Sequence, residues 1–149
     1  MNIIQFPDEV LITSSAKVVD YKRASEIADN LISVIRKLDK PFTFGLGMAA
    51  PQIGVSARII VLRMSYQNYK IMINPEIIEQ KWTIITPSKC FSLKGTYLTK
   101  AHLWIKVKYY DLDEKQHIQV VTGAKAITLQ QEIDHINGKL LHDRGIRIW

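Results

Sequence analysis

Residues 131–135 of this chain read QEIDH, within a segment, 123–137, whose pattern predicts a helix. Positions 131 and 135 are one turn apart and therefore project from the same face of such a helix. Metal hydrolases use this spacing in H-E-x-x-H, where two His side chains hold the ion and the Glu is the general base. Here Gln131 takes the place of the first His. The match alone is weak, because these residue types also meet by chance on solvated helix faces.

Outward from this stretch, the pattern predicts two helices and several strands. Apolar residues recur at three- and four-residue steps from 22 to 38, with Asp20 as an N-cap. The second helix is expected to run from Gly123 or Ala124 to Asn137, with Gly138 ending it. Runs of strand-forming residues are Arg58–Arg63, Tyr69–Asn74, Ile77–Ile85, Leu103–Tyr110 and His117–Val121.

Helices and strands do not alternate regularly along the chain, which argues against a parallel α/β fold. We therefore predict an α+β fold with mostly antiparallel β-sheets around a central helix that carries QEIDH. A length of 149 residues suits a single domain, residues 1–149. The composition, 47% hydrophobic and 23% charged, is that of an ordinary globular protein.

Composition also limits the environment and the partners. The N-terminus has no secretory pattern and no run of eighteen apolar residues occurs, so we expect a cytoplasmic protein with no membrane partner. A single cysteine, Cys90, leaves no internal disulfide framework. The net charge of +6 would favour RNA through non-specific attraction, which makes a small RNA-binding domain one hypothesis. The basic residues are scattered, however, and no specific nucleic-acid sequence is expected as partner.

Two further segments give the QEIDH stretch a context. Residues 45–52 read GLGMAAPQ, and residues 88–92 read SKCFS. In this order the three segments resemble the motifs of peptide deformylases, which run G-φ-G-φ-A-A-P-Q, E-G-C-L-S and H-E-φ-D-H. The first is matched throughout, the second keeps its Cys and Ser, and the third keeps all but the first His. With weaker similarity over most of its length, the chain is identified as a shortened, divergent member of this family.

The resemblance implies a divalent metal, Fe²⁺ by family, with Zn²⁺ or Ni²⁺ as alternatives. The matching ligand positions are Cys90, His135 and Gln131. A glutamine offers only a neutral amide oxygen, a weaker donor than imidazole for such metals, so metal binding and activity are expected to fall. Without the motif context, Cys90 would be a small buried hydrophobe and His135 a core histidine.

The resemblance also implies roles around the metal. Glu132 would shuttle a proton, while the Gln52 amide and the backbone N–H of Phe91 would stabilise the oxyanion. Four residues are candidates for substrate binding: two glycines for close backbone approach, and two apolar walls of a methionine pocket that core packing explains equally well. These are Gly45, Gly47, Ile133 and Leu129.

The implied activity is hydrolysis of the N-formyl group from formyl-methionyl nascent peptides, with the ribosome as a further expected partner. Lys89, where the family has glycine, could fill the cleft or anchor a carboxylate. The alternative function is an inactive protein of the same fold that binds peptide N-termini without turnover. These two hypotheses differ in whether a formyl peptide is consumed or only bound.

Overall fold

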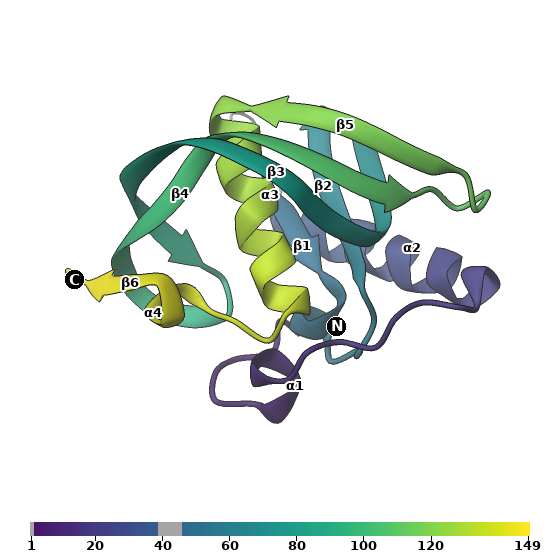
Figure 1. The fold of residues 1–149 in the computed structure, drawn as a ribbon. Coiled ribbons are helices and arrows are strands. Elements are labelled where there is room, and N and C mark those ends of the chain that lie inside the picture. Colours follow the sequence, from purple (N-terminus) through teal and green to yellow (C-terminus); the bar gives the residue numbers. More distant parts are fainter. Residues whose placement is uncertain (1, 39–45) are drawn as a thin grey trace.

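The computed structural model describes residues 2–38 and 46–149 of the chain (Figure 1). One helix, α3, runs through the middle of the molecule, with the curved strands β3, β4 and β5 arching over it. The elements are, in order, α1 (Glu9–Ile12), α2 (Tyr21–Leu38), β1 (Gly47–Ala49), the 3₁₀ helix η1 (Ala50–Ile53), β2 (Ile59–Ser65), β3 (Asn68–Cys90), β4 (Leu93–Tyr110), β5 (Gln116–Thr122), α3 (Gly123–Ile136), α4 (Leu141–Arg144) and β6 (Gly145–Arg147).

The strands form an antiparallel sheet in the order β1-β2-β3-β4-β5, with β6 paired to β4. β3 and β4 form the longest pair, and their register shifts at three places between Ile73 and Cys90. Such bulges bend a strand and increase its twist, which lets the pair curve around α3 instead of lying flat. β3 ends at Cys90, which pairs with Leu93 at the tip of the hairpin.

Two apolar clusters hold the helices to the sheet. α2 presents Ala24, Ile27, Leu31 and Ile35 to β1 and β2. α3 contributes Leu129 and other side chains to a second cluster, formed with β2 and β4. α3 is thus covered on more than one side, which fixes its axis relative to β1 and to the end of β3.

The predicted fold class, α+β with antiparallel strands around the helix that carries QEIDH, is confirmed. α2 begins one residue before the expected start, and Asp20 accepts a hydrogen bond from the Arg23 N–H at 3.1 Å, as an N-cap does. α3 ends at Ile136, and Gly138 has a φ of 72°. Two strands expected at 69–74 and 77–85 are one, β3, because bulges carry the pairing through the interruption. None of the described helices has the length and apolarity to cross a membrane.

Candidate active site

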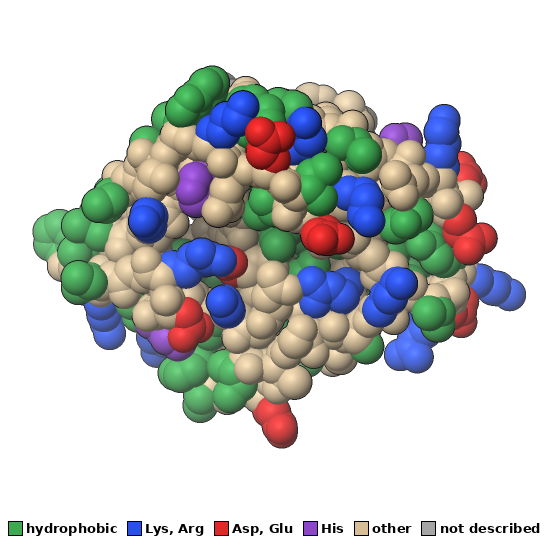
Figure 2. Space-filling view, viewed as in Figure 1, with side chains coloured by type: hydrophobic (Ala, Val, Ile, Leu, Met, Phe, Trp, Pro, Cys, Tyr) green, Lys and Arg blue, Asp and Glu red, His purple; other side chains and the backbone are tan. Residues whose placement is uncertain are grey.

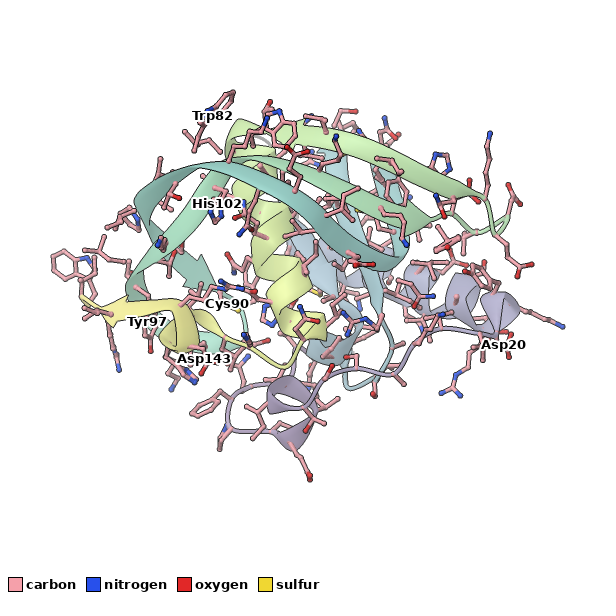
Figure 3. All side chains as sticks on the ribbon, viewed as in Figure 1. Asp20, Trp82, Cys90, Tyr97, His102 and Asp143 are labelled. Atoms are coloured by element: carbon pink, nitrogen blue, oxygen red, sulfur yellow. The ribbon has the colours of Figure 1, made fainter. Side chains whose placement is uncertain are left out.

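The end of β3 meets the last turn of α3, and this junction brings two metal-ligating side chains together. The Cys90 Sγ lies 3.3 Å from the His135 Nε2. Figure 3 shows Cys90 beside α3 under the arch of β3 and β4. The cysteine is half-buried and the imidazole is 1% exposed. A thiol and an imidazole far apart in the sequence therefore share one site, as predicted.

A cleft of about 260 Å³ opens next to Cys90. Its walls come from β1, η1, the end of β3 and one face of α3. The lining residues are Leu46, Gly47, Gln52, Pro87, Ser88, Lys89, Cys90, Phe91, Ile127, Thr128, Gln131 and Glu132. Five of the predicted site residues line it directly, in addition to Cys90, and the cleft is large enough for a side chain and the adjoining peptide group.

Glu132 lies at the inner wall of this cleft, 4% exposed. Its Oε2 is buried and has no hydrogen-bond partner among the described residues. Burial, aided by the nearby Asp134 carboxylate, raises the pKa of Glu132 to about 8. A carboxyl group with such a pKa exchanges a proton near neutral pH, which is what a combined general acid and base requires.

Gln52 is fixed in η1 by two hydrogen bonds. Its Oε1 accepts from the Ala49 N–H at 3.0 Å, and its Nε2 donates to the Ser92 Oγ at 3.3 Å. The side chain is 1% exposed, and these bonds orient its amide nitrogen toward the end of β3. A pre-oriented N–H donor at the wall of a cleft is suited to stabilising an oxyanion.

Gln131 lies in the cleft, but its amide is engaged with the strand. The Nε2 donates to the Lys89 carbonyl at 3.0 Å, and the same side chain hydrogen-bonds the Cys90 thiol. Gln131 therefore ties α3 to the residue that precedes Cys90. In this orientation the amide nitrogen, which cannot bind a metal, is the atom held against the strand.

Gly47 occupies the place where β1 approaches α3. A Cβ added here would lie 2.8 Å from the Leu62 Cδ2 and 3.0 Å from the Glu132 Cγ. Only a residue without a side chain fits between them. The glycine thus allows the β1 backbone to line the cleft next to Glu132, consistent with the close backbone approach expected for it.

The remaining predicted residues lie in different places. Gly45 is outside the described residues. Phe91 lines the cleft and is 47% exposed. Leu129 and Ile133 are not part of the cleft lining. Both are buried in the apolar cluster under β2 and β4, and Ile133 also lines the groove next to the cleft. The α3 residues that face the cleft are instead Thr128 and Ile127. They point away from Leu129 because neighbouring positions on a helix point about 100° apart.

Sequence reasoning gave no role to several residues that the structure places here. Ser92 belongs to the SKCFS motif, but its hydrogen bond to Gln52 joins residues 40 positions apart and no local pattern indicates it. Ile127 and Thr128 were missed as cleft walls because the helix pattern shows which residues are apolar, and not which of two neighbouring elements each one faces. The signal that could have found Thr128 is its position three residues before Gln131, on the same face.

A second, more polar groove adjoins the cleft and shares Ser88, Ile127 and Gln131 with it. It opens on the face seen in Figure 2, where a hollow near the centre is bordered by Lys and Arg side chains. His102, on β4, lies at the border of this groove (Figure 3). Gln131 thus lies between the cleft and the groove.

Two of the three implied ligand positions, Cys90 and His135, have donors that suit a divalent metal. Zinc ligands lie about 2.3 Å (S) and about 2.0 Å (N) from the ion in tetrahedral geometry, which separates them by roughly 3.5 Å, close to the 3.3 Å seen here. Burial lowers the pKa of His135 to about 4, so its imidazole is neutral, as a ligand must be. Within residues 2–38 and 46–149, no group of three His, Cys, Asp or Glu side chains is placed to hold one ion.

Comparison with known proteins connects this site to a family. Residues 1–148 match the family model described as polypeptide deformylase. A peptide deformylase of Desulforudis audaxviator is 34% identical over 150 residues, covering 99% of this chain and 94% of that protein. One of Dictyoglomus thermophilum is 35% identical, covering 93% and 88%.

Solved structures agree with the sequence matches. The crystal structure of peptide deformylase from Thermotoga maritima superposes with a TM-score of 0.87 at 28% identity, and 97% of each chain is covered. The actinonin-bound peptide deformylase of Acinetobacter baumannii gives a TM-score of 0.85 at 26% identity, covering 97% of each chain. Fold, sequence and the Cys–His junction lead to the same assignment: this chain belongs to the polypeptide deformylase family, a family of metal-dependent hydrolases.

Proposed function

We propose that this chain removes the formyl group from formyl-methionyl peptides at the Cys90–His135 junction. The observation that carries the proposal is the 3.3 Å contact of these two donors beside a buried carboxyl group, Glu132. Relatives that cover most of the chain bear the name peptide deformylase, which gives no support to the alternative of a binding protein without turnover.

We assign the metal to Cys90 and His135, with the Gln131 carbonyl oxygen as third donor after rotation of its amide. When bound, a divalent ion there polarises the formyl carbonyl and lowers the pKa of a water molecule. Thiolate and imidazole together suit Fe²⁺, Zn²⁺ and Ni²⁺. The amide of Gln131 is a weaker donor than imidazole, so we expect the ion to bind weakly. The ion that is most abundant in the cell is then expected to occupy the site.

The protein's own groups carry the proton and hold the substrate. Glu132 takes a proton from the attacking water and returns it to the amine that leaves, so that water and formamide become formate and a free N-terminus. The Gln52 Nε2 donates to the oxygen that becomes negative as the carbonyl carbon turns tetrahedral. We place the first side chain of the substrate beside Ile127 and Thr128, which line the cleft on its helix side.

Formylated chains arise at the ribosome, so we propose action there, in the cytoplasm. The net charge of +6 supports non-specific attraction to ribosomal RNA. The contact would be weak and would fall with salt, because scattered charges make few simultaneous phosphate contacts.

The direct test is formate release from formyl-Met-Ala-Ser by anaerobically purified protein loaded with Fe²⁺, Zn²⁺ or Ni²⁺. We expect release that stops with a chelator and that Glu132→Gln lowers by at least about 100-fold, the lower range for loss of a general acid–base group. Absence of formate with every ion, from protein shown to contain the ion, would refute the proposal.

A further inference from the structure

One cation in the cleft has no assigned role. Lys89 is exposed, whereas the residues on either side of it, Ser88 and Cys90, are half-buried. It lines the cleft, and no ion pair or hydrogen bond to its ammonium is found in the part of the chain that the structure describes. Its backbone is held in place, because the Gln131 Nε2 donates to the Lys89 carbonyl at 3.0 Å.

Among the described residues that line the cleft, no ionised side chain lies against this ammonium. Of these twelve residues, Lys89 and Glu132 are the only ones with an acidic or basic side chain. Glu132 is buried at the inner wall, 4% exposed, whereas Lys89 is exposed to solvent. The mouth of the cleft is therefore positive, with a flexible four-carbon stem that can move its charge toward a ligand.

An extended peptide presents its successive side chains on opposite sides, about 3.3 Å apart along the chain. When the formyl group lies beside Cys90 and the first side chain enters the cleft next to Ile127 and Thr128, the second side chain points back toward the mouth. At that distance it lies near the two residues next to Cys90 that line the cleft, Lys89 and Phe91, and of these only Lys89 carries a charge. Building on the deformylase function proposed above, we propose that Lys89 selects formyl peptides with a carboxylate side chain at the second position.

The experiment compares formyl-Met-Asp-Ser with its neutral isostere formyl-Met-Asn-Ser on the metal-loaded protein. We expect kcat/KM to be roughly two- to fivefold higher for the Asp peptide at low salt, the range of an exposed ion pair, and to approach that of the Asn peptide as salt rises. Lys89→Met should reduce the ratio to about one, and Lys89→Glu should reverse it in favour of formyl-Met-Lys-Ser. Because Lys89 is exposed, both variants are expected to fold.

Two controls make the result specific. Lys94→Met removes an exposed cation from the same hairpin that does not line the cleft, and it should leave the ratio unchanged. Formyl-Met-Ala-Asp moves the carboxylate to the third position, where no preference is expected. A wild-type ratio of one, a ratio that survives Lys89→Met, or a preference at the third position only would overturn the proposal.

Binding distinguishes failure of this inference from failure of the deformylase function. Calorimetry with the product peptides Met-Asp-Ser and Met-Asn-Ser needs no turnover. An inactive protein that still binds the Asp peptide more tightly through Lys89 would refute the deformylase function and uphold the selectivity. An active protein that turns over and binds both peptides equally well would uphold the deformylase function and refute the selectivity.

Discussion

The Sγ of Cys90 and the Nε2 of His135 lie 3.3 Å apart although 45 positions separate them in the chain. Cys90 is at the end of a strand, and His135 is in the last turn of a buried helix. The β3–β4 hairpin fixes the position of Cys90, and the packing of α3 against the sheet fixes the position of His135. The folded chain therefore presents both donors before any ion binds, which lowers the conformational cost of binding one.

Replacing Gln131 by His should strengthen the metal site. An imidazole at this position supplies the third nitrogen or sulfur donor that the described residues lack, and metal affinity should rise at least about tenfold, since even changes outside the ligand sphere alter affinity by about 10- to 100-fold. Competition with a chromophoric chelator measures it. Formate release at limiting metal should rise in parallel.

The matched control is the same change at the neighbouring position. Gln130 faces β4, where its amide bonds both the N–H and the carbonyl of His102, at 2.8 and 2.7 Å. Gln130→His should therefore give no gain in metal affinity. Equal gains in both variants would show that added histidine, and not the geometry at position 131, accounts for the effect.

Metal affinity should also rise with pH. Burial, and to a lesser extent the charge of Glu132, raises the pKa of the Cys90 thiol to about 11, so an ion must displace a proton from the sulfur at every pH below that. His135 releases none above pH 5, because its pKa is about 4. One proton released corresponds to about tenfold higher affinity per pH unit.

Competition titrations at pH 6, 7 and 8 check this slope. Below pH 5 the slope should steepen toward two protons as His135 also becomes protonated. The variant Cys90→Ser loses the thiol and should bind weakly without this dependence. A pH-independent affinity in the unmodified chain would mean that the sulfur does not hold the ion.

The fold class could be predicted because local sequence patterns determine its helices and strands. The three- and four-residue apolar spacing of α2, its Asp20 cap and the Gly138 stop of α3 are all local, and each lies within a residue or two of its expected place. The strand pairing is not local. β3 continues from Asn68 to Cys90 because bulges at three places absorb the irregularities in its pairing with β4, and no local sequence pattern predicts those bulges.

The close approach of Cys90 and His135 could be predicted, but the walls of the cleft could not. Cys90, His135 and Glu132 follow from motif positions, whereas the cleft face of α3 depends on which neighbour each helical residue meets. Leu129 is apolar and was therefore a reasonable wall, yet it packs under the sheet, while the polar Thr128 faces the cleft. The engagement of the Gln131 amide with Lys89 required coordinates as well, since it joins residues 42 positions apart.

The buried Glu132 should make the metal-free protein less stable as pH rises from 6.5 to 8. Its pKa is raised from 4.5 to about 8, so the native state keeps a proton that the unfolded chain loses, and stability falls by about 1.4 kcal/mol per pH unit. His135 acts in the opposite direction between about pH 4 and 6.5, because its pKa is lowered and the unfolded chain takes up the proton. Between about pH 4.5 and 6.5 the two effects on stability offset each other.

Urea unfolding of the metal-free protein at pH 6.5 and 8.0 measures this decline in the free energy of unfolding. Glu132→Gln should abolish the decline, since an amide does not titrate. Glu76→Gln removes an exposed carboxylate, 65% accessible, and should leave it unchanged. If Glu132→Gln and the parent chain lose stability equally over this range, the carboxyl group is not buried as the structure shows.

Arg144 should stabilise the helix end that carries His135. Its Nε and Nη2 donate to the two carboxylate oxygens of Asp134 at 2.5 and 2.6 Å, and the Asp134 side chain is only 11% exposed. Burial raises the pKa of Asp134, and the Arg144 guanidinium opposes that rise. Arg144→Met leaves a nearly buried carboxyl group without its charged partner, at a cost of roughly 1–2 kcal/mol, reduced because Arg144 is half-exposed.

Urea unfolding at pH 7 compares this variant with Arg147→Met, a similar change at an exposed arginine, whose Nε bonds the Trp149 carbonyl. The loss should be larger for Arg144→Met. Adding Asp134→Asn should recover part of it, because a neutral amide needs no cation and costs less to bury. No recovery in the double variant would mean that Arg144 stabilises α4 by packing, and that its charge is dispensable.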